Sequence, residues 1–185
     1  MGTTDFSSIV NKIKDANPDV IFSVVAGNDS VAFYSACAQY GLDMASTPIC
    51  SLACHEGTIK GIGEAAVGSY SCFNYFNTLG TEASDEFVAK YKELYGTDTT
   101  VNNGAESTYT GIYMLAAAIK AAGSTNPADI IAAAADLEVE CPAGTIKMDS
   151  ANHHAWLPVY IGKVNADLEF DIISTSDGLV EPVVD

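Results

Sequence analysis

The hydrophobic positions of the first forty residues form a strand that leads directly into a helix. Residues 20–25 are nearly all apolar and rich in β-branched side chains, which is typical of a parallel strand covered on both faces. Gly27 ends this strand, and Asn28, Asp29 and Ser30 follow as candidate helix caps before apolar positions return at helical spacing. We therefore expect a polar loop at the carboxyl edge of a parallel strand, where open α/β sheets bind ligands.

The same alternation of helix and strand patterns continues over the first eighty residues. Apolar residues at helical spacing predict an amphipathic helix over 5–16, with Thr4 or Asp5 as its cap. Short apolar runs predict two more strands, over 48–52 and 67–76, separated by a loop and a short helix. This rhythm is typical of a parallel sheet with flanking helices.

From residue 84 the pattern changes to consecutive helices. Apolar stripes at helical spacing predict helices over 84–95, 105–122 and 127–137. Two apolar segments around a polar turn, 157–164 and 168–173, predict a β-hairpin near the carboxyl terminus. The fold class that follows is α/β, a parallel sheet with flanking helices, a helical segment and a carboxyl-terminal β-hairpin.

Composition and charge narrow the range of partners. The chain has 24 acidic and 8 basic residues, a formal charge of −16, which repels phosphate backbones and argues against nucleic acid. No apolar run is long enough for a membrane-spanning helix, so no membrane insertion is expected. The first residues lack the basic and apolar regions of a signal peptide, so the chain as given would stay in the cytoplasm. The five cysteines are an odd number with no C-x-x-C pair, and we expect buried free thiols.

Two short motifs could suggest chemistry, and neither is convincing. Cys54, His55 and Glu56 offer a nucleophile, a base and an acid, but adjacent residues on a loop rarely point at one another. His153 and His154 would splay apart in a strand, and no third metal ligand stands at a suitable spacing. We therefore expect no catalytic residues, no metal and no cofactor, and we do not expect an enzyme.

One resemblance is carried by residues 4–14, 18–23, 73–76, 87–92 and 152–159, of which the last, with Asn-His-His before a strand, is the most specific. These segments together resemble the urea and short-chain-amide solute-binding proteins of ABC transporters. Such proteins are type I periplasmic binding proteins, allied to the branched-chain amino-acid binders and to amide-sensing regulators. The resemblance covers nearly all of this chain but only the carboxyl-terminal half of such a protein.

The resemblance implies a two-lobed, periplasmic binder that closes on a small polar solute, such as urea, a short amide or an amino acid, and delivers it to an ABC permease. Residues 1–77 and 152–185 would form the second-lobe α/β domain. Residues 78–151 would be a helical segment that belongs to the first lobe. The alternative is an amide or amino-acid sensor, or an interaction domain, that keeps the fold without transport.

The resemblance also places the cleft at the loops after the second-lobe strands, residues 26–30 and 51–56. Amide and urea groups both donate and accept hydrogen bonds, so carboxylate and hydroxyl acceptors are needed beside backbone donors. Tyr75 near the lobe crossing would close over a solute unless it belongs to the core, and Glu106 would face the first lobe. The candidate ligand-binding residues are Asn28, Asp29, Ser30, Ser51, Glu56 and Tyr75.

The helical stripes of residues 84–137 raise a further expectation. In the family they would pack against the sheet of the first lobe, which these 185 residues do not encode. Exposing them to water costs about 25 cal/mol for each Å² of apolar surface. The stripes must therefore fold back onto the chain's own sheet or bury themselves against a second copy. We expect the second outcome, a symmetric homodimer.

Overall fold

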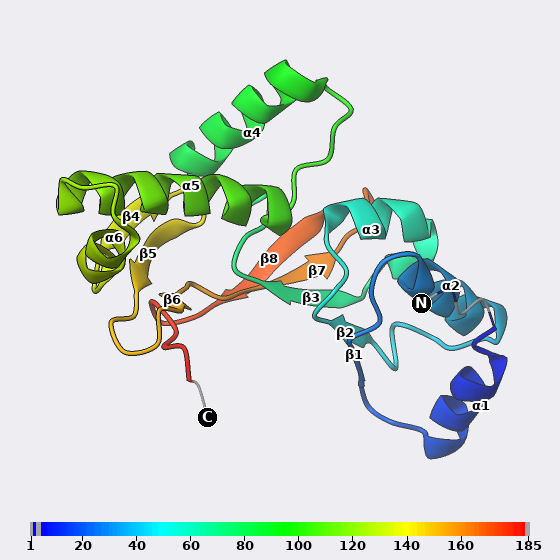
Figure 1. The fold of residues 1–185 in the computed structure, drawn as a ribbon. Coiled ribbons are helices and arrows are strands. Elements are labelled where there is room, and N and C mark those ends of the chain that lie inside the picture. Colours follow the sequence, from blue (N-terminus) through cyan, green and yellow to red (C-terminus); the bar gives the residue numbers. More distant parts are fainter. Residues whose placement is uncertain (1, 3–4, 184–185) are drawn as a thin grey trace.

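The computed structural model describes residues 2 and 5–183, and these residues form an α/β part and a mainly helical part (Figure 1). The α/β part contains α1 (Ser7–Ala16), β1 (Ile21–Ser23), α2 (Asn28–Gln39), β2 (Ile49–Ser51), α3 (Glu56–Ile62), the 3-10 helix η1 (Gly63–Ala66), β3 (Tyr70–Phe73), β7 (Tyr160–Val164) and β8 (Phe170–Thr175). The helical part contains α4 (Glu82–Tyr95), α5 (Asn103–Ala122), α6 (Pro127–Ala134), β4 (Glu138–Cys141), β5 (Gly144–Met148) and β6 (Ala155–Trp156).

The main sheet is mixed rather than parallel throughout. Its strand order is β1-β2-β3-β7-β8, with β1, β2 and β3 parallel and β7 antiparallel to both β3 and β8. The carboxyl-terminal hairpin predicted from the sequence is confirmed as β7–β8. Because it pairs with the edge of β3, the returning chain completes the sheet on the side opposite β1. The α/β fold class is confirmed with this correction.

The first strand is covered on one face only, so the prediction of burial on both faces is wrong. Ile21 and Ser23 are buried, whereas Phe22 and Val24 are 70% and 69% exposed. The core on the buried face joins α1, α2 and α3 to β1, β2 and β8. An apolar pattern shows that both faces of a strand could be buried, but not that a partner covers them. Within the described residues, Phe22 and Val24 on the second face stay largely exposed.

The helical part has a hydrophobic core of its own. The described part of the chain forms a second cluster around a small antiparallel sheet, ordered β4-β5-β6, and α4 and α5. This sheet includes β4, a strand that the sequence did not predict. The buried members of the cluster are Tyr75, Phe87, Val101, Met114, Cys141, Ala143 and Ile146.

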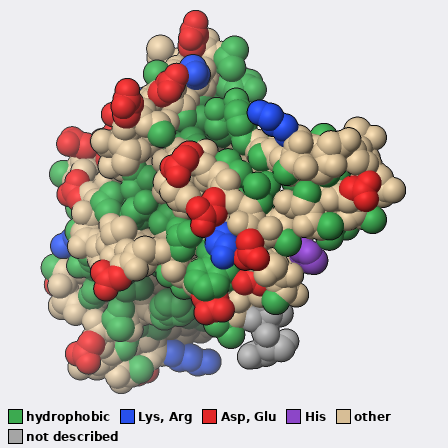
Figure 2. All heavy atoms as spheres, turned by 90° about the vertical axis from the view of Figure 1, so that its left-hand side faces the viewer, with side chains coloured by type: hydrophobic (Ala, Val, Ile, Leu, Met, Phe, Trp, Pro, Cys, Tyr) green, Lys and Arg blue, Asp and Glu red, His purple; other side chains and the backbone are tan. Residues whose placement is uncertain are grey.

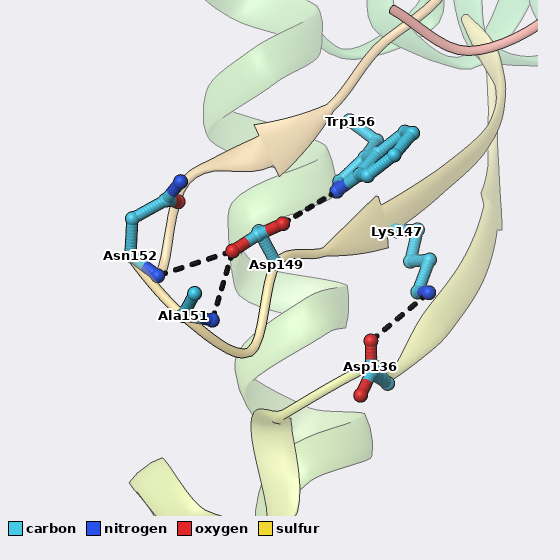
Figure 3. Close-up of polar contacts among 6 residues, drawn as sticks. All are labelled: Asp136, Lys147, Asp149, Ala151, Asn152 and Trp156. Carbon is cyan, nitrogen blue, oxygen red and sulfur yellow. Dashed lines mark hydrogen bonds and ion pairs between the residues drawn. The ribbon is translucent and has the colours of Figure 1, made fainter. Parts of the chain in front are cut away.

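The turn between β5 and β6 is held by one carboxylate (Figure 3). Asp149 Oδ1 accepts two backbone N–H groups of the turn at 2.8 and 3.1 Å, and its Oδ2 accepts the indole N–H of Trp156 at 2.8 Å. These bonds hold the pKa of Asp149 below its usual value. Lys147 and Asp136 form an ion pair of 2.9 Å nearby. Residues 152–159, which carry the most specific part of the resemblance, therefore begin in a tight turn and continue into β6.

The start of α2 differs from the predicted cap. Gly27 occupies the N-cap position with φ +63°, and no side chain caps the helix. Asn28, Asp29 and Ser30 lie in the first turn instead, and Ser30 Oγ donates to the carbonyl of Val25 at 2.7 Å. The positive φ suits glycine, which has no Cβ to strain. The backbone thus turns sharply at the edge of the sheet, with Asn28 exposed and Ser30 buried in the first helical turn.

Other predicted boundaries are close to the observed ones. The Oδ1 atom of Asp5 accepts the N–H of Ser7 at 2.9 Å at the start of α1, while Thr4 lies outside the described residues. Asn126 caps α6 by accepting the N–H of Ala128 at 3.0 Å, although the helix ends at Ala134 rather than 137. The strand predicted over 67–76 shortens to β3 because the residues after it leave the sheet.

Candidate functional site

The two parts of the molecule meet at residues 74–81, which we call the crossing segment because it leads from β3 to α4 (Figure 1). Asn74 Nδ2 donates to Ser107 Oγ of α5 at 3.4 Å. The backbone N–H of Asn77 donates to Glu56 Oε1 of α3 at 2.9 Å. The crossing segment therefore touches the first turn of a helix from each part.

Glu56 is one of two buried glutamates beside the crossing segment, the other being Glu106. It is 2% exposed, and its Oε2 has no hydrogen-bond partner among the described residues. Burial raises the pKa of its carboxyl to about 7, against the weaker opposing effects of the Asn77 N–H and the charge of Lys60. The sequence predicted a solute acceptor at this position, but the side chain points into the protein and its Oε1 is used by Asn77.

A second polar contact joins α3 to the start of α5. His55 Nδ1 accepts the N–H of Gly57 at 3.2 Å and lies 3.5 Å from Asn102 Nδ2, while Nε2 lies 3.4 Å from the hydroxyl of Thr58. Burial lowers the pKa of His55, which favours the neutral ring with its proton on Nε2. Asn102 also caps α5 by accepting the N–H of Ala105 at 3.1 Å.

His55 and Asn102 are not among the ligand-binding residues predicted from the sequence. A usable signal existed for Asn102, because an asparagine directly before a long apolar helical stripe is a good cap. No signal placed it next to His55, since the two are 47 residues apart and meet only through the packing of the two parts.

The predicted residues of the first two loops divide into exposed and buried ones. Asn28 is exposed, and Asp29 is half-buried and accepts the N–H of Gly2 at 2.9 Å. Ser30 and Ser51 are both buried, and Ser51 Oγ accepts two backbone N–H groups at 3.0 and 3.1 Å. The serines thus shape the loops, while Asn28 and Asp29 are the side chains open to a solute.

Tyr75 belongs to the core of the helical part. It is fully buried, its hydroxyl lies 3.1 Å from Ser84 Oγ, and its ring packs edge-on against Phe87 with centroids 6.1 Å apart. Burial raises the pKa of Tyr75 to about 12, against the hydrogen bond with Ser84, which lowers it, and with a smaller contribution from the nearby carboxylates. Of the two roles considered for this tyrosine, the observed packing is that of a core residue.

Glu106 lies beside a cavity of about 210 Å³ between α5, the small sheet and the crossing segment. The side chain is 1% exposed and accepts the hydroxyls of Thr110 at 2.6 Å and Ser107 at 3.4 Å. The polar wall is formed by these three residues and Asn74, and the opposite wall is apolar, formed by Met114, Ile146, Met148, Ala155 and Leu157.

Groups of three or more residues able to hold a metal ion do not occur in the described part of the chain. All five cysteines are free, with Cys37, Cys54 and Cys141 buried. Between residues 5 and 183, no helix combines the length and apolar character that crossing a membrane requires. The polar groups described above can bind and orient a small polar molecule through hydrogen bonds.

The α/β part and the helical part thus each have a hydrophobic core of their own, and polar loops lie beside the crossing segment that connects them. The chain belongs to the periplasmic binding protein domain family, whose model matches residues 1–184. The two structural relatives described next are a solute-binding protein of an ABC transporter and an amino-acid-binding protein.

Two solved structures illustrate the match. A solute-binding protein of an ABC transporter from Rhodopseudomonas palustris BisB5, in complex with 3,4-dihydroxybenzoic acid, is 27% identical with a TM-score of 0.84, covering 96% of this chain and 50% of that one. The closed leucine-, isoleucine-, valine-, threonine- and alanine-binding protein from Brucella ovis is 26% identical with a TM-score of 0.84, covering 98% and 49%.

The curated relatives match this chain over only part of their own length. Leu/Ile/Val-binding protein homolog 6 of Brucella melitensis is 23% identical over 168 residues, which are 89% of this chain and 43% of the relative. A protein of Geobacillus stearothermophilus called limonene hydroxylase is 37% identical over 112 residues, but these are 60% of this chain and only 20% of that protein. The chain thus spans less than half the length of these relatives.

Proposed function

We propose that the chain is the carboxyl-terminal half of a two-lobed solute-binding protein of an ABC transporter. Residues 1–77 and 152–185 form its second lobe, and residues 78–151 belong to the first. The family match over residues 1–184 carries this proposal. Two separate hydrophobic cores support a division into two lobes, although Tyr75 and β6 pack with the helical part and not with the second lobe. In the whole protein the lobes would close on the solute by a hinge motion.

The solute we propose is urea, a short amide or an amino acid. Exposed Asn28 and half-buried Asp29 offer an amide and a carboxylate at the carboxyl edge of β1, and His55 and Asn102 add polar groups beside the crossing. A planar group with two heteroatoms, whether urea, amide or carboxylate, matches such donors and acceptors. The structural relatives named above bind amino acids or a hydroxybenzoate, which share such a group.

The proposed setting is the periplasm, with an ABC permease as the partner that receives the solute. The family's name and its ABC-transporter relatives support both. The permease contact requires the whole protein, because both lobes of a closed binder present their outer surfaces to it.

The second proposed partner is another copy of this chain. The accessible surface is 10345 Å², whereas a compact monomer of 19.4 kDa has about 8,500 Å². The excess, about 1,800 Å², is more than twice the roughly 800 Å² that each partner buries in a standard interface. Figure 2 shows apolar side chains among the acidic ones on the side of α4, α5 and α6; the exposed ones there include Leu94, Tyr95, Ile112, Tyr113, Leu115 and Ile131.

The helical stripes do not fold back onto the main sheet, which was the competing expectation. The helical part packs around its own small sheet, and Ile112 of α5 remains 63% exposed. A second copy that covered these stripes would remove the excess surface from water. Light scattering should therefore return about twice 19.4 kDa at low micromolar concentration. The monomer mass would refute the homodimer and leave the stripes to another segment of a longer protein.

A thermal-shift screen tests the proposed function. The melting temperature of this chain, and of a longer protein that contains it, is measured with urea, acetamide, leucine and 4-hydroxybenzoate, because a ligand that binds only the native state raises it. We expect urea, acetamide or leucine to stabilise the longer protein clearly and this chain weakly. No shift of the longer protein with any of the four would refute the proposal.

A further inference from the structure

One buried carboxyl group links the α/β part to the crossing segment. Glu56 begins α3, and its Oε1 accepts the N–H of Asn77, which lies in the middle of the crossing segment. The bond of 2.9 Å spans 21 residues of sequence and ties the sheet side of the molecule to the chain that leads into the helical part. Any change in the direction of the crossing segment has to lengthen or break it.

The second oxygen of the same carboxyl group makes this tie sensitive to protons. Oε2 is fully buried and has no donor among the residues that the structure describes. If the group is ionised, the protein loses the free energy of burying a charge without a partner. If it is protonated, the protein loses only the smaller free energy of one missing hydrogen bond. The buried arrangement therefore favours the neutral acid.

The ionisable groups around Glu56 do not remove this preference. Lys60, one turn further along α3, favours the carboxylate, but its effect is smaller than that of burial. The carboxyl side chains of Glu56 and Glu106 both act on Tyr75 of the crossing segment and raise the pKa of its hydroxyl. His55, the neighbour in the preceding loop, has a pKa lowered by burial and supplies no positive charge at neutral pH.

We propose that Glu56 and Asn77 form a proton-dependent latch on the crossing segment. The latch is closed when Glu56 is protonated, with its carbonyl oxygen accepting the Asn77 N–H. When the proton leaves to water, the carboxylate gains by reaching solvent, and the crossing segment loosens. The orientation of the two parts thus depends on pH near neutrality, whatever solute the protein carries.

The magnitude follows from the two states of the carboxyl group. Burial raises the pKa of Glu56 to about 7 in the closed latch, and a solvated carboxyl has its ordinary value of 4.5. Opening should therefore become about tenfold more favourable between pH 6 and pH 8, because the open state binds fewer protons than the closed state across this interval.

Amide hydrogen exchange over residues 74–80 tests the latch. Protection factors are measured at pH 6 and pH 8 and corrected for the intrinsic effect of pH on exchange. The native chain is compared with Glu56→Gln and with the control Glu64→Gln, which replaces an exposed glutamate. We expect protection to fall about tenfold in the native chain and in Glu64→Gln, and to stay constant in Glu56→Gln. Equal protection of the native chain at both pH values, or the same fall in Glu56→Gln, would overturn the proposal.

A second measurement keeps the test independent of whether the variant folds. The side-chain carboxyl carbon of Glu56 in the native chain is followed by NMR from pH 4 to pH 9. We expect its midpoint near pH 7, together with a change in the amide shift of Asn77 at the same pH. A midpoint near 4.5, or an Asn77 amide that does not follow it, would overturn the latch.

Discussion

Replacement of Gly162 by alanine should destabilise the main sheet at the point where the returning chain joins it. Gly162 lies in β7 between Ser71 of β3 and Ile172 of β8. A Cβ at this position would lie 2.9 to 3.1 Å from three atoms of the Phe170 side chain. Phe170 is buried and packs against Phe76 with ring centroids 4.6 Å apart, so it has little room to move.

The expected cost follows from this geometry. Adding a methyl group to a well-packed core costs about 1–3 kcal/mol through displaced side chains. Gly61→Ala is the matched control, because its Cβ would meet only a methyl of Val31 at 3.7 Å, and alanine in helix α3 should stabilise by about 0.5–1 kcal/mol. The free energy of unfolding is measured by urea denaturation with far-UV circular dichroism.

A double variant separates the clash from other effects. If the Phe170 ring causes the loss, Gly162→Ala combined with Phe170→Leu should be less destabilised than the sum of the two single variants, by roughly 1 kcal/mol. Additive effects, or a Gly162→Ala variant as stable as the native chain, would refute the close packing of β7 against Phe170.

Three further predictions concern charge, solute binding and capping. The folded state raises the pKa of the Glu56 carboxyl from 4.5 to about 7, so this group stabilises the fold below pH 4.5 and loses that contribution as the pH rises through 7. The free energy of unfolding of Glu56→Gln, measured by urea denaturation, should therefore rise by about 2–3 kcal/mol relative to that of the native chain between pH 5 and pH 8. A difference that stays constant with pH would contradict this. Asp29→Asn should leave stability almost unchanged but alter solute selectivity in calorimetry of the longer protein, and unchanged selectivity would remove Asp29 from the site. Asn126→Ala should cost about 1 kcal/mol by removing the cap of α6, whereas a neutral result would show that the cap contributes nothing.

Local signals in the sequence were sufficient for the helices and the hairpin. Asn126 followed by Pro127 marks the start of α6 because cap and fixed φ act within one turn. Apolar spacing likewise located α5 and the β7–β8 hairpin. Local signals could not predict which faces of β1 are buried, because Phe22 and Val24 are apolar whether or not a partner packs on them.

The position of the two candidate loops followed from the sequence, whereas the orientation of their side chains did not. The loops after β1 and β2 do lie at the carboxyl edge of parallel strands, as expected. Ser51 turns its hydroxyl to its own backbone, and Glu56 turns inward because the crossing segment supplies an N–H donor there. Both orientations depend on contacts between segments distant in sequence, which no local pattern contains.

The most direct test of the central claim is NMR mapping of a solute on the amide spectrum of this chain. In the proposed two-lobed binder, the other wall of the cleft comes from residues outside this chain. We therefore expect urea, acetamide or leucine to bind this chain in the millimolar range, because about half of the polar contacts would be missing. We expect the shift changes to concentrate at Asn28, Asp29, His55 and Asn102, the polar groups beside the crossing. Changes confined to α5, α6 and the small sheet, or none at any concentration with any of the three solutes, would contradict it.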